Sequence, residues 1–360
     1  MTRPVLVLSR YSRLGASSRL RTMQYRPYLA AEGLAPTYSS LFDDDYLERL
    51  YAKRSTSANV ARAVLARIRQ LRNPGTASLL WIEKEPLPWL PWPVEKALLP
   101  RGLPLATDFD DAIFHRYDLH RSAIVRRVLG RKIDRIMAAS EIVLAGNAYL
   151  AERANKAGAR RVEIVPTVVD LDAYGLRDQD APKSEPRIGW IGTPQTWEVY
   201  LAPMMPELDV VAARTGARIS AVGAGKEAGD FPFVDAIPWT ENTEIACIQD
   251  MDIGIMPLDD TPWARGKCGY KLIQYMACGI PVVASPVGVN REIVEHGVNG
   301  FLATTGAEWR AALTTLLGDP DLRRKMAAEG RRKVENEFSL QVWGPRVARM
   351  LKDIARNHGR

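Results

Sequence analysis

Residues 252–300 carry the most informative pattern in the chain, DIGIMPLDDTPWARGKCGYKLIQYMACGIPVVASPVGVNREIVEHGVNG. The apolar run 252–256 predicts a buried strand, and the spacing of apolar residues over 271–278 predicts a helix after it. A second strand at 281–284 and a second helix at 290–296 continue the alternation. Strands that alternate with helices are typical of a mainly parallel sheet covered on both faces.

The same alternation extends over the rest of the chain. Further strands are predicted at residues 5–9, 79–83, 104–109, 136–145, 162–165, 187–191 and 219–222, and further helices at 21–33, 59–73, 121–135, 308–317, 320–338 and 342–356. Residues 171–186 are polar, contain two prolines and have the composition of a linker. We therefore predict an α/β protein with two doubly wound domains, 1–170 and 187–340. Since ligands of such sheets bind at the carboxyl ends of the strands, chemistry is expected in a cleft between two facing domains.

The composition excludes several classes of protein. Of the 360 residues, 46% are hydrophobic and 25% are charged, which is ordinary for a globular chain and excludes a disordered one. The three cysteines, Cys247, Cys268 and Cys278, fit neither a disulfide framework nor a zinc motif, so a reducing compartment is expected. No apolar run approaches the roughly 20 residues that span a bilayer. The five-residue apolar run near the start is predicted to be a strand rather than a signal peptide. A cytoplasmic protein is the expectation.

Charge is distributed unevenly along the chain. Residues 1–170 hold 27 basic and 17 acidic residues, a net of +10, whereas residues 171–360 hold 22 and 25, a net of −3. A basic half suggests an anionic partner such as a membrane surface, a phosphorylated acceptor or a nucleic acid. Arginine-rich helices that only keep this half in solution are the alternative.

Three cations surround the predicted start of the helix at 271–278. Arg265, Lys267 and Lys271 flank Gly269, and the backbone N–H groups at a helix start bind phosphate groups. The spacing is that of a diphosphate site, with a solvated basic loop as the alternative.

The run YMACGIPVVASPVGVNREIVEHGVNGFL at 275–302 closely resembles the carboxyl-terminal domain of family-4 glycosyltransferases of the GT-B type. The resemblance extends from about residue 266 to 302. Weaker similarity is found in RIGWIG at 187–192, VGAG at 222–225, IVPTVVD at 164–170 and GASSRLR at 15–21. It implies a GT-B fold, in which two Rossmann-like domains face a central cleft. It also implies that residues 341–360 form a last helix that crosses back to the amino-terminal domain.

The resemblance further implies a reaction. A sugar moves from a nucleoside diphosphate to an acceptor hydroxyl, with retention of configuration and without a metal or another cofactor. The N–H groups of Gly269, Tyr270 and Lys271 would face the diphosphate, and Lys267 with Lys271 would stabilise the departing charge. Gly192, at the end of the strand that opens the second domain, would also bind the donor.

Two glutamates that the family places eight positions apart are absent. Their positions hold Gly266 and Gln274. Gln274 can still hydrogen-bond a ribose diol, and Asp259 or Asp260 is a possible substitute for the first glutamate. The segment 193–197, TPQTW, lacks the cations that often grip the diphosphate in the family, so Arg265, Lys267 and Lys271 are expected to do so.

An acidic loop follows the strand predicted at 104–109. The chain has Asp108, Asp110 and Asp111 there, and His115 comes shortly after. Asp110 and Asp111 are the predicted catalytic carboxylates, while Asp108 and His115 are predicted to bind the acceptor. Carboxylates this close raise at least one pKa, which often marks a functional site. A helix N-cap is the alternative, and a Mg²⁺ site is a lesser one.

Two further segments attract attention. Gly15, after the first strand, lets a ligand approach the backbone and is predicted to bind the donor, while Arg19 and Arg21 are predicted to contact an anionic acceptor. The segment 86–93, PLPWLPWP, with Trp81 just before it, would suit a membrane interface or a lipid-linked acceptor if exposed. We favour a buried loop.

The predicted function is transfer of a hexosyl group to a cell-surface glycan or a lipid-linked acceptor, as in polysaccharide or lipopolysaccharide biosynthesis. Contact with an anionic membrane through the basic half would place the protein at the inner face of the membrane. A sugar-nucleotide 2-epimerase on the same scaffold is an alternative. So is an inactive protein that binds carbohydrate or nucleic acid, although no nucleic-acid recognition motif is present.

Overall fold

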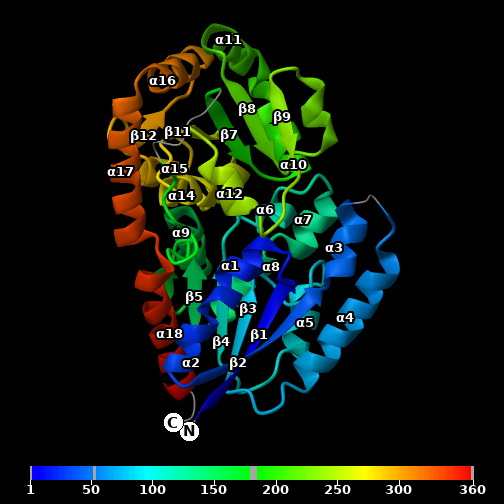
Figure 1. Cartoon of the computed structure of the whole chain (residues 1–360). Helices are drawn as coiled ribbons and strands as arrows, with labels where there is room; N and C mark the ends of the chain where they lie inside the picture. Colours follow the sequence, from blue (N-terminus) through cyan, green and yellow to red (C-terminus); the bar gives the residue numbers. More distant parts are fainter. Residues whose placement is uncertain (1, 52–53, 179–184, 358–360) are drawn as a thin grey trace. The chain divides into compact units, whose positions relative to one another are not determined.

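The computed structural model describes residues 2–51, 54–178 and 185–357, and the chain forms two compact units (Figure 1). The amino-terminal unit comprises the chain up to Thr167 together with residues 266–268 and the segment from Leu340 onward. The carboxyl-terminal unit comprises Val168–Arg265 and Gly269–Ser339.

The amino-terminal unit is built on a six-stranded parallel sheet. Its strands are β1 (Arg3–Tyr11), β2 (Leu34–Phe42), β3 (Leu79–Glu83), β4 (Leu105–Phe109), β5 (Ile142–Ala145) and β6 (Val162–Ile164), in the order β2-β1-β3-β4-β5-β6. Its helices are α1 (Ala16–Arg21), α2 (Arg26–Ala31), α3 (Asp44–Tyr51), α4 (Ser57–Arg72), α5 (Trp92–Leu98), α6 (His115–Asp118), α7 (Ala123–Leu129), α8 (Lys132–Ala139), α9 (Ala148–Ala157) and α18 (Leu340–Asn357). The residues of β3 and β4 are buried throughout, as expected for central strands covered on both faces.

The carboxyl-terminal unit repeats this architecture. Its strands are β7 (Arg187–Ile191), β8 (Arg218–Val222), β9 (Val234–Ile237), β10 (Ile253–Met256), β11 (Val282–Ala284) and β12 (Gly300–Leu302), in the order β12-β11-β10-β7-β8-β9, all parallel. Its helices are α10 (Pro194–Thr196), α11 (Met205–Thr215), α12 (Glu244–Gln249), α13 (Pro262–Arg265), α14 (Tyr270–Ala277), α15 (Asn290–Ile293), α16 (Gly306–Gly318) and α17 (Pro320–Glu337). The predicted doubly wound α/β class is confirmed in both units.

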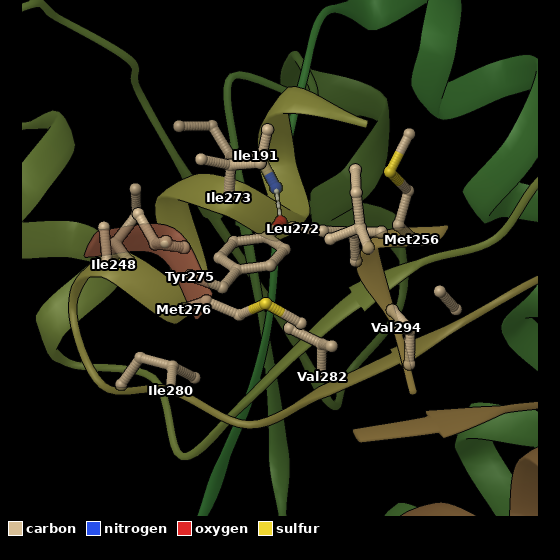
Figure 2. Packing of buried hydrophobic residues seen from close by; sticks show 14 of the residues in the cluster. Ile191, Ile248, Met256, Leu272, Ile273, Tyr275, Met276, Ile280, Val282 and Val294 are labelled. Carbon is tan, nitrogen blue, oxygen red and sulfur yellow. Dashed lines mark hydrogen bonds between the residues drawn. The ribbon is translucent and has the colours of Figure 1, made fainter. Parts of the chain in front are cut away.

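Helix α14 is anchored to the sheet of the carboxyl-terminal unit by a buried tyrosine. Figure 2 shows the Tyr275 ring among aliphatic side chains, with its hydroxyl oxygen accepting a hydrogen bond from the Ile191 N–H at 3.0 Å. A Cβ atom on Gly254 would lie 2.3 Å from this ring, so the glycine leaves the space that the ring fills. The anchor fixes the start of α14 relative to the end of β7.

Helix α18 packs within the amino-terminal unit. Lys352 Nζ donates to Glu32 Oε2 at 2.7 Å, and Arg3 Nη1 donates to the Ala355 carbonyl at 2.9 Å. A Cβ atom on Gly344 would lie 2.5 Å from the Tyr28 ring, which shows how closely the helix approaches α2. The last helix of the chain is therefore part of the amino-terminal unit's structure.

Some predicted boundaries are wrong. Residues 136–139 belong to α8 rather than to a strand, because Ile133, Ile136 and Met137 are buried at helical spacing, and β5 begins only at Ile142. The single helix predicted at 121–135 is two helices, α7 and α8, and residues 21–33 contain a 3₁₀ turn before α2. Strand β2 was not predicted, because it is polar and contains Pro36, which an edge strand tolerates.

Candidate active site

A cluster of charged side chains lies where β3 and β4 end in the amino-terminal unit. Lys84, directly after β3, places its Nζ 2.8 Å from Asp110 Oδ1 and 3.6 Å from Asp111 Oδ2, and Glu83 Oε1 is 3.9 Å away. Because β3 and β4 are parallel neighbours, their carboxyl ends meet at one edge of the sheet. The acidic loop predicted from the sequence therefore has a lysine at its centre.

The backbone of Lys84 is held in an unusual conformation. Its φ angle is 65°, which is rare for a residue with a side chain, and its N–H donates to the Asp108 carbonyl at 2.8 Å. Burial by itself lowers the pKa of Lys84, but the carboxylates of Asp110, Asp111 and Glu83 raise it above its usual value. Lys84 is thus a fixed positive charge on a strained turn, and strain of this kind is often found at functional sites.

The two aspartates next to Lys84 differ in their surroundings. Burial raises the pKa of Asp110, but the charges of Lys84 and Arg21 and the hydrogen bonds from Lys84 and Ser17 together outweigh it, and the net pKa is lowered. For Asp111, burial and the neighbouring Asp110 charge outweigh Lys84 and Lys267, so its pKa is raised. Asp111 is also the more accessible of the pair, with 29% of its side chain exposed against 11% for Asp110. Asp111 is therefore the better placed to exchange a proton with a ligand.

Arg21 and Asp108 form a buried ion pair next to this cluster. Arg21 Nε and Nη2 donate to the two Asp108 oxygens at 2.7 and 3.1 Å, and Arg21 Nη1 donates to the Val165 carbonyl at 2.8 Å. Both side chains are fully buried. Burial raises the pKa of Asp108 to about 6, against the opposing effect of Arg21. The structure thus places these two predicted acceptor ligands in contact with each other.

Helix α1 is tied to the same edge of the sheet. Glu83 Oε2 accepts hydrogen bonds from Ser18 Oγ at 2.5 Å and from the Arg10 N–H at 2.9 Å. Burial raises the pKa of Glu83. A Cβ atom on Gly15 would lie 2.4 Å from Tyr11 Cβ, so packing against Tyr11 already requires a glycine at the start of α1.

Arg19 and His115 have partners within the same unit. Arg19 Nη1 donates to the Arg13 carbonyl at 3.1 Å. His115 Nδ1 is 2.8 Å from Asp118 Oδ1, and its Nε2 is 2.8 Å from the Tyr149 hydroxyl. The imidazole is therefore fixed on both sides, which defines its orientation.

The segment 266–268 packs against the acidic loop. A Cβ atom on Gly266 would lie 2.4 Å from Ala112 Cβ, and the Lys267 carbonyl accepts a hydrogen bond from Asn147 Nδ2 at 2.9 Å. Cys268 Sγ lies 3.1 Å from the Asp110 carbonyl oxygen. Gly266 is therefore required by close packing, and Lys267 belongs to the same unit as the predicted catalytic aspartates.

In the carboxyl-terminal unit, two of the predicted donor residues, Lys271 and Gly192, lie beside Trp190. Lys271 Nζ lies 4.2 Å from the centre of the Trp190 ring, a cation–π contact. A Cβ atom on Gly192 would lie 2.3 Å from that ring. Gly269, which precedes α14, has a φ angle of 65°, and a Cβ atom on it would lie 2.3 Å from Ile293 Cδ1. The indole thus links the end of β7 to the first turn of α14.

Gln274 is part of a buried polar network. Its Nε2 donates to the Tyr174 hydroxyl at 2.7 Å and to Glu244 Oε1 at 2.8 Å, and the Tyr174 hydroxyl also donates to Glu244 Oε1 at 2.7 Å. Trp239 Nε1 donates to Glu244 Oε2 at 2.7 Å, and the Tyr270 hydroxyl is 3.4 Å from that of Tyr174. A carboxylate is therefore present beside Gln274, although it comes from α12 rather than α14.

Arg265 forms an exposed ion pair with Asp260. Its Nε and Nη2 donate to the two Asp260 oxygens at 2.6 and 3.0 Å, and these bonds lower the pKa of Asp260. Asp260 is thus engaged with a cation of the same loop. Exposed ion pairs of this kind are weak and exchange easily with water or a ligand.

The acidic loop does not resemble a metal site. Its carboxylates are paired with Lys84 and Arg21. Within residues 2–51, 54–178 and 185–357, no group of three or more histidine, cysteine, aspartate and glutamate side chains is arranged to hold a metal ion. In this structure the carboxylates of Asp110 and Asp108 are therefore engaged by Lys84 and Arg21.

Sequence reasoning missed Lys84, Glu244 and Trp190. Lys84 follows a correctly predicted strand, so the rule that selected Asp110 would also have selected it. Glu244 and Gln274 are 30 positions apart and meet only through the fold, so the sequence carries no direct signal for their contact.

Comparison with known proteins shows which family and which fold the chain resembles. Residues 185–319 match the family model described as Glycosyl transferases group 1. The N-acetyl-alpha-D-glucosaminyl L-malate synthase of Bacillus anthracis is 36% identical over 93 residues, 25% of this chain and 24% of that protein. A GDP-mannose-dependent monoacylated alpha-(1-6)-phosphatidylinositol monomannoside mannosyltransferase of Corynebacterium glutamicum is 26% identical over 221 residues, 54% of this chain and 57% of that protein. The chain thus aligns with a quarter to just over half of the length of these relatives.

Two solved structures share the fold over nearly the whole chain. Sucrose-phosphate synthase of Thermosynechococcus elongatus has a TM-score of 0.71 at 15% identity, covering 98% of this chain and 99% of that one. Anabaena HepE, solved with UDP and glucose, has a TM-score of 0.69 at 16% identity, covering 98% and 100%. The chain therefore has the GT-B fold of these two structures, and residues 185–319 are similar to the group 1 glycosyltransferase family model. The resemblance found at 266–302 is confirmed at this level.

One negative finding concerns the membrane. Among the helices that the structure describes, none combines the length and the apolar character required to span a bilayer.

Proposed function

We propose that this protein transfers a hexosyl group from a nucleoside diphosphate sugar, with retention and without a metal, to a cell-surface glycan or a lipid-linked acceptor. The observation that carries the proposal is the start of α14, which lies within the family match. There, Lys271 is fixed on the Trp190 ring beside Gly192, and Gly269 adopts a left-handed backbone. Helix starts with adjacent cations bind phosphate groups.

The diphosphate would be stabilised by fixed charges. Lys267 and Lys271 flank Gly269 in the sequence, and Arg265 forms an exposed ion pair with Asp260. Charges that are already in position when the leaving group departs lower the barrier without reorganisation. The Corynebacterium relative is named for GDP-mannose, and HepE was solved with UDP-glucose. Together they support a nucleoside diphosphate sugar as donor without selecting the base.

On the acceptor side, we assign Asp111 to the exchange of a proton with the acceptor hydroxyl. Its raised pKa and its accessibility suit that role. Asp110 and Lys84 would hold Asp111 and the acceptor in place through their ion pair. The buried ion pair of Arg21 and Asp108 would support this arrangement. Arg19 and His115 remain candidate contacts for an anionic acceptor.

The carboxylate cluster also favours a second candidate function. A sugar-nucleotide 2-epimerase requires acid and base groups in its active site, and Glu83, Asp110 and Asp111 provide three carboxyl groups around one lysine. The two functions differ in their need for an acceptor. An epimerase converts the donor sugar alone, whereas a transferase leaves the sugar of the unreacted donor unchanged.

The test is donor binding followed by product analysis. UDP-, GDP- and ADP-sugars are screened by thermal shift, because a ligand of the folded state raises the unfolding temperature. The selected donor is then titrated calorimetrically into the wild type, Lys267→Ala and the exposed control Lys325→Ala. We expect the control to match the wild type and Lys267→Ala to bind more weakly or turn over more slowly. If no nucleotide sugar binds, the proposal is wrong; if the donor sugar is epimerised without an acceptor, the second candidate is correct.

We also propose a cytoplasmic location at the inner face of the membrane, through the basic amino-terminal unit.

A further inference from the structure

Large apolar side chains are exposed together on one surface of the amino-terminal unit. These residues are Trp89, Leu119, Ile124 and Val128, and their exposed fractions are 49%, 59%, 75% and 49%. We call these four residues, together with the exposed cations Arg121, Arg127 and Arg131, the α7 surface. Ile124 and Val128 lie one turn apart on α7 and so share a face. The Trp89 ring contacts the ring of His120, the residue after Leu119, with 5.8 Å between ring centres.

The same surface is strongly basic. Residues 119–133 include five lysines and arginines and no acidic residue. Arg121, Arg127 and Arg131 are exposed, and in the described part of the chain no ion pair is recorded for their side chains. Arg127 lies on α7 one turn from Ile124, and Arg121 and Arg131 lie just before and just after the helix. Exposed apolar groups and unpaired cations are therefore interspersed on one surface.

Trp89 is held in its exposed position by the backbone and by a buried network. Its φ angle is 65°, which is unfavourable for an aromatic residue. Its N–H donates to the Tyr117 hydroxyl at 3.1 Å, and its ring packs edge-on against the Tyr117 ring at 5.2 Å. The Tyr117 hydroxyl donates to both Glu85 oxygens, at 2.9 and 2.8 Å. The contacts with Tyr117 thus fix the position of the Trp89 indole.

A fully buried lysine completes that network. Lys132 Nζ is 2.8 Å from Glu85 Oε2 and 3.3 Å from Glu95 Oε1, and it donates to the Leu87 carbonyl at 2.5 Å. Glu95 Oε1 in turn accepts from the Leu87 N–H at 2.9 Å. The buried charges of Lys132, Glu85 and Glu95 hold this loop in place, although its Trp89 side chain stays half exposed. Packing of the core does not explain this arrangement, because burying charges is costly and Trp89 adds little to the core. The arrangement instead keeps the Trp89 indole at the surface.

We propose that the α7 surface docks on an anionic lipid bilayer. Trp89, Leu119, Ile124 and Val128 would enter the interfacial layer, where tryptophan is favoured. Arg121, Arg127 and Arg131 would contact the lipid phosphates, and each cation near an anionic surface strengthens binding. This inference is independent of the proposed reaction, because binding to lipid requires no donor sugar.

A second basic face provides the matched control. Helix α4 has the exposed arginines Arg62, Arg69 and Arg72, but among its described residues Leu65 is the one large exposed apolar side chain. Both faces attract anions. The α7 surface differs in its apolar side chains and its fixed indole, so equivalent substitutions on the two helices separate insertion into lipid from attraction by charge.

The experiment is co-sedimentation of the full chain with lipid vesicles. Vesicles of pure phosphatidylcholine are compared with vesicles that contain about 30% phosphatidylglycerol, at roughly 0.1 M salt. The variants are Arg121→Gln with Arg127→Gln, and Ile124→Ser with Val128→Ser. The controls are Arg69→Gln with Arg72→Gln, and Leu65→Ser. Circular dichroism and thermal unfolding establish that each variant is folded.

We expect the wild type to bind the anionic vesicles and to be released by salt. The arginine pair on the α7 surface should weaken partitioning about 25-fold, since each surface arginine contributes about fivefold. The apolar pair should weaken it roughly tenfold, and the α4 variants should remain within about twofold of the wild type. The proposal is overturned if the wild type does not bind, if it binds both vesicles equally, or if the α4 variants lose more binding than the α7 variants. Calorimetric donor binding by the same variants shows whether the donor site is intact, so failure of this inference is distinct from failure of the proposed reaction.

Discussion

The two sheets of this protein carry different kinds of residues at their carboxyl edges. At the carboxyl edge of the amino-terminal sheet, β3 and β4 end in Glu83, Lys84, Asp110 and Asp111, which are charged and paired with one another. The corresponding edge of the other sheet has glycines and aromatic rings. Gly192 follows β7 and Gly223 follows β8, and a Cβ atom on Gly223 would lie 2.3 Å from the Gly192 carbonyl oxygen.

This difference suggests a division of labour on one repeated architecture. Glycines allow a ligand to approach the backbone, and in the carboxyl-terminal unit the nearby cation Lys271 rests on an indole. Carboxylates held around a lysine can instead exchange protons. Under the proposed function, the sheet edge in the carboxyl-terminal unit binds the donor, and the sheet edge in the amino-terminal unit acts on the acceptor. The following predictions test that division, beginning with the largest effect.

The first prediction concerns the leaving group. Lys267→Ala should reduce the rate of sugar transfer by about 10²- to 10³-fold, because a positioned charge is most effective on charge that develops in the transition state. Steady-state kinetics with the donor chosen by thermal shift measure kcat, and Lys325→Ala serves as the exposed lysine control. Turnover close to that of the wild type would show that Lys267 does not stabilise the diphosphate.

The second prediction concerns the acidic loop. Asp111→Asn should lower kcat by about 10²-fold and leave donor affinity almost unchanged. Because the pKa of Asp111 is raised, its ionised form increases as pH rises through that pKa. Activity of the wild type should therefore rise with pH, and the rise should be absent in Asp111→Asn. Asp110→Asn should also reduce kcat. If both variants match the wild type, the cluster has a structural role.

A comparison of prediction with structure shows where sequence patterns are informative. Strands with continuous apolar runs, such as β3 and β7, were predicted with the observed boundaries. The strand predicted at 136–145 is wrong over 136–139, because Ile136 and Met137 suit either a strand or a buried helix and only the packing of α8 decides between them. Edge strand β2 has too few apolar residues to be distinguished from a loop.

The candidate site was predictable to the extent that it follows strand ends. Asp110 and Asp111 were found because they come directly after β4. The pairing of Arg21 with Asp108 and of Gln274 with Glu244 could not be found, since the partners are 87 and 30 positions apart. Contacts between such distant residues depend on strand order and helix placement, and local sequence periodicity does not encode either one.

The third prediction concerns the network around Gln274. Replacing Gln274 with glutamate introduces the residue that the sequence resemblance implies at this position, but it would place a second carboxylate where Nε2 now donates to Glu244 Oε1 at 2.8 Å. Two buried carboxylates in contact repel each other, so Gln274→Glu should lower the free energy of unfolding by about 2–4 kcal/mol at pH 8. Chemical denaturation measures the loss. The double variant Glu244→Gln/Gln274→Glu should recover most of the stability, and failure to recover it would show that charge repulsion is not the cause.

The fourth and smallest prediction concerns the buried charges beneath Trp89. Burial raises the pKa of Glu95 to about 7, above the value of about 4.5 that an unfolded chain would have. The folded state therefore binds a proton more tightly than the unfolded state, so the free energy of unfolding should fall as pH rises from about 4.5 to about 7.

Glu95→Gln keeps an oxygen that can accept from the Leu87 N–H and removes the charge. It should flatten this part of the pH profile and raise stability at pH 8 by about 1–3 kcal/mol. Lys132 would keep its 2.8 Å ion pair with Glu85, so the loop should stay in place. Denaturation at several pH values measures both effects, and an unchanged slope would indicate that Lys132 keeps Glu95 ionised.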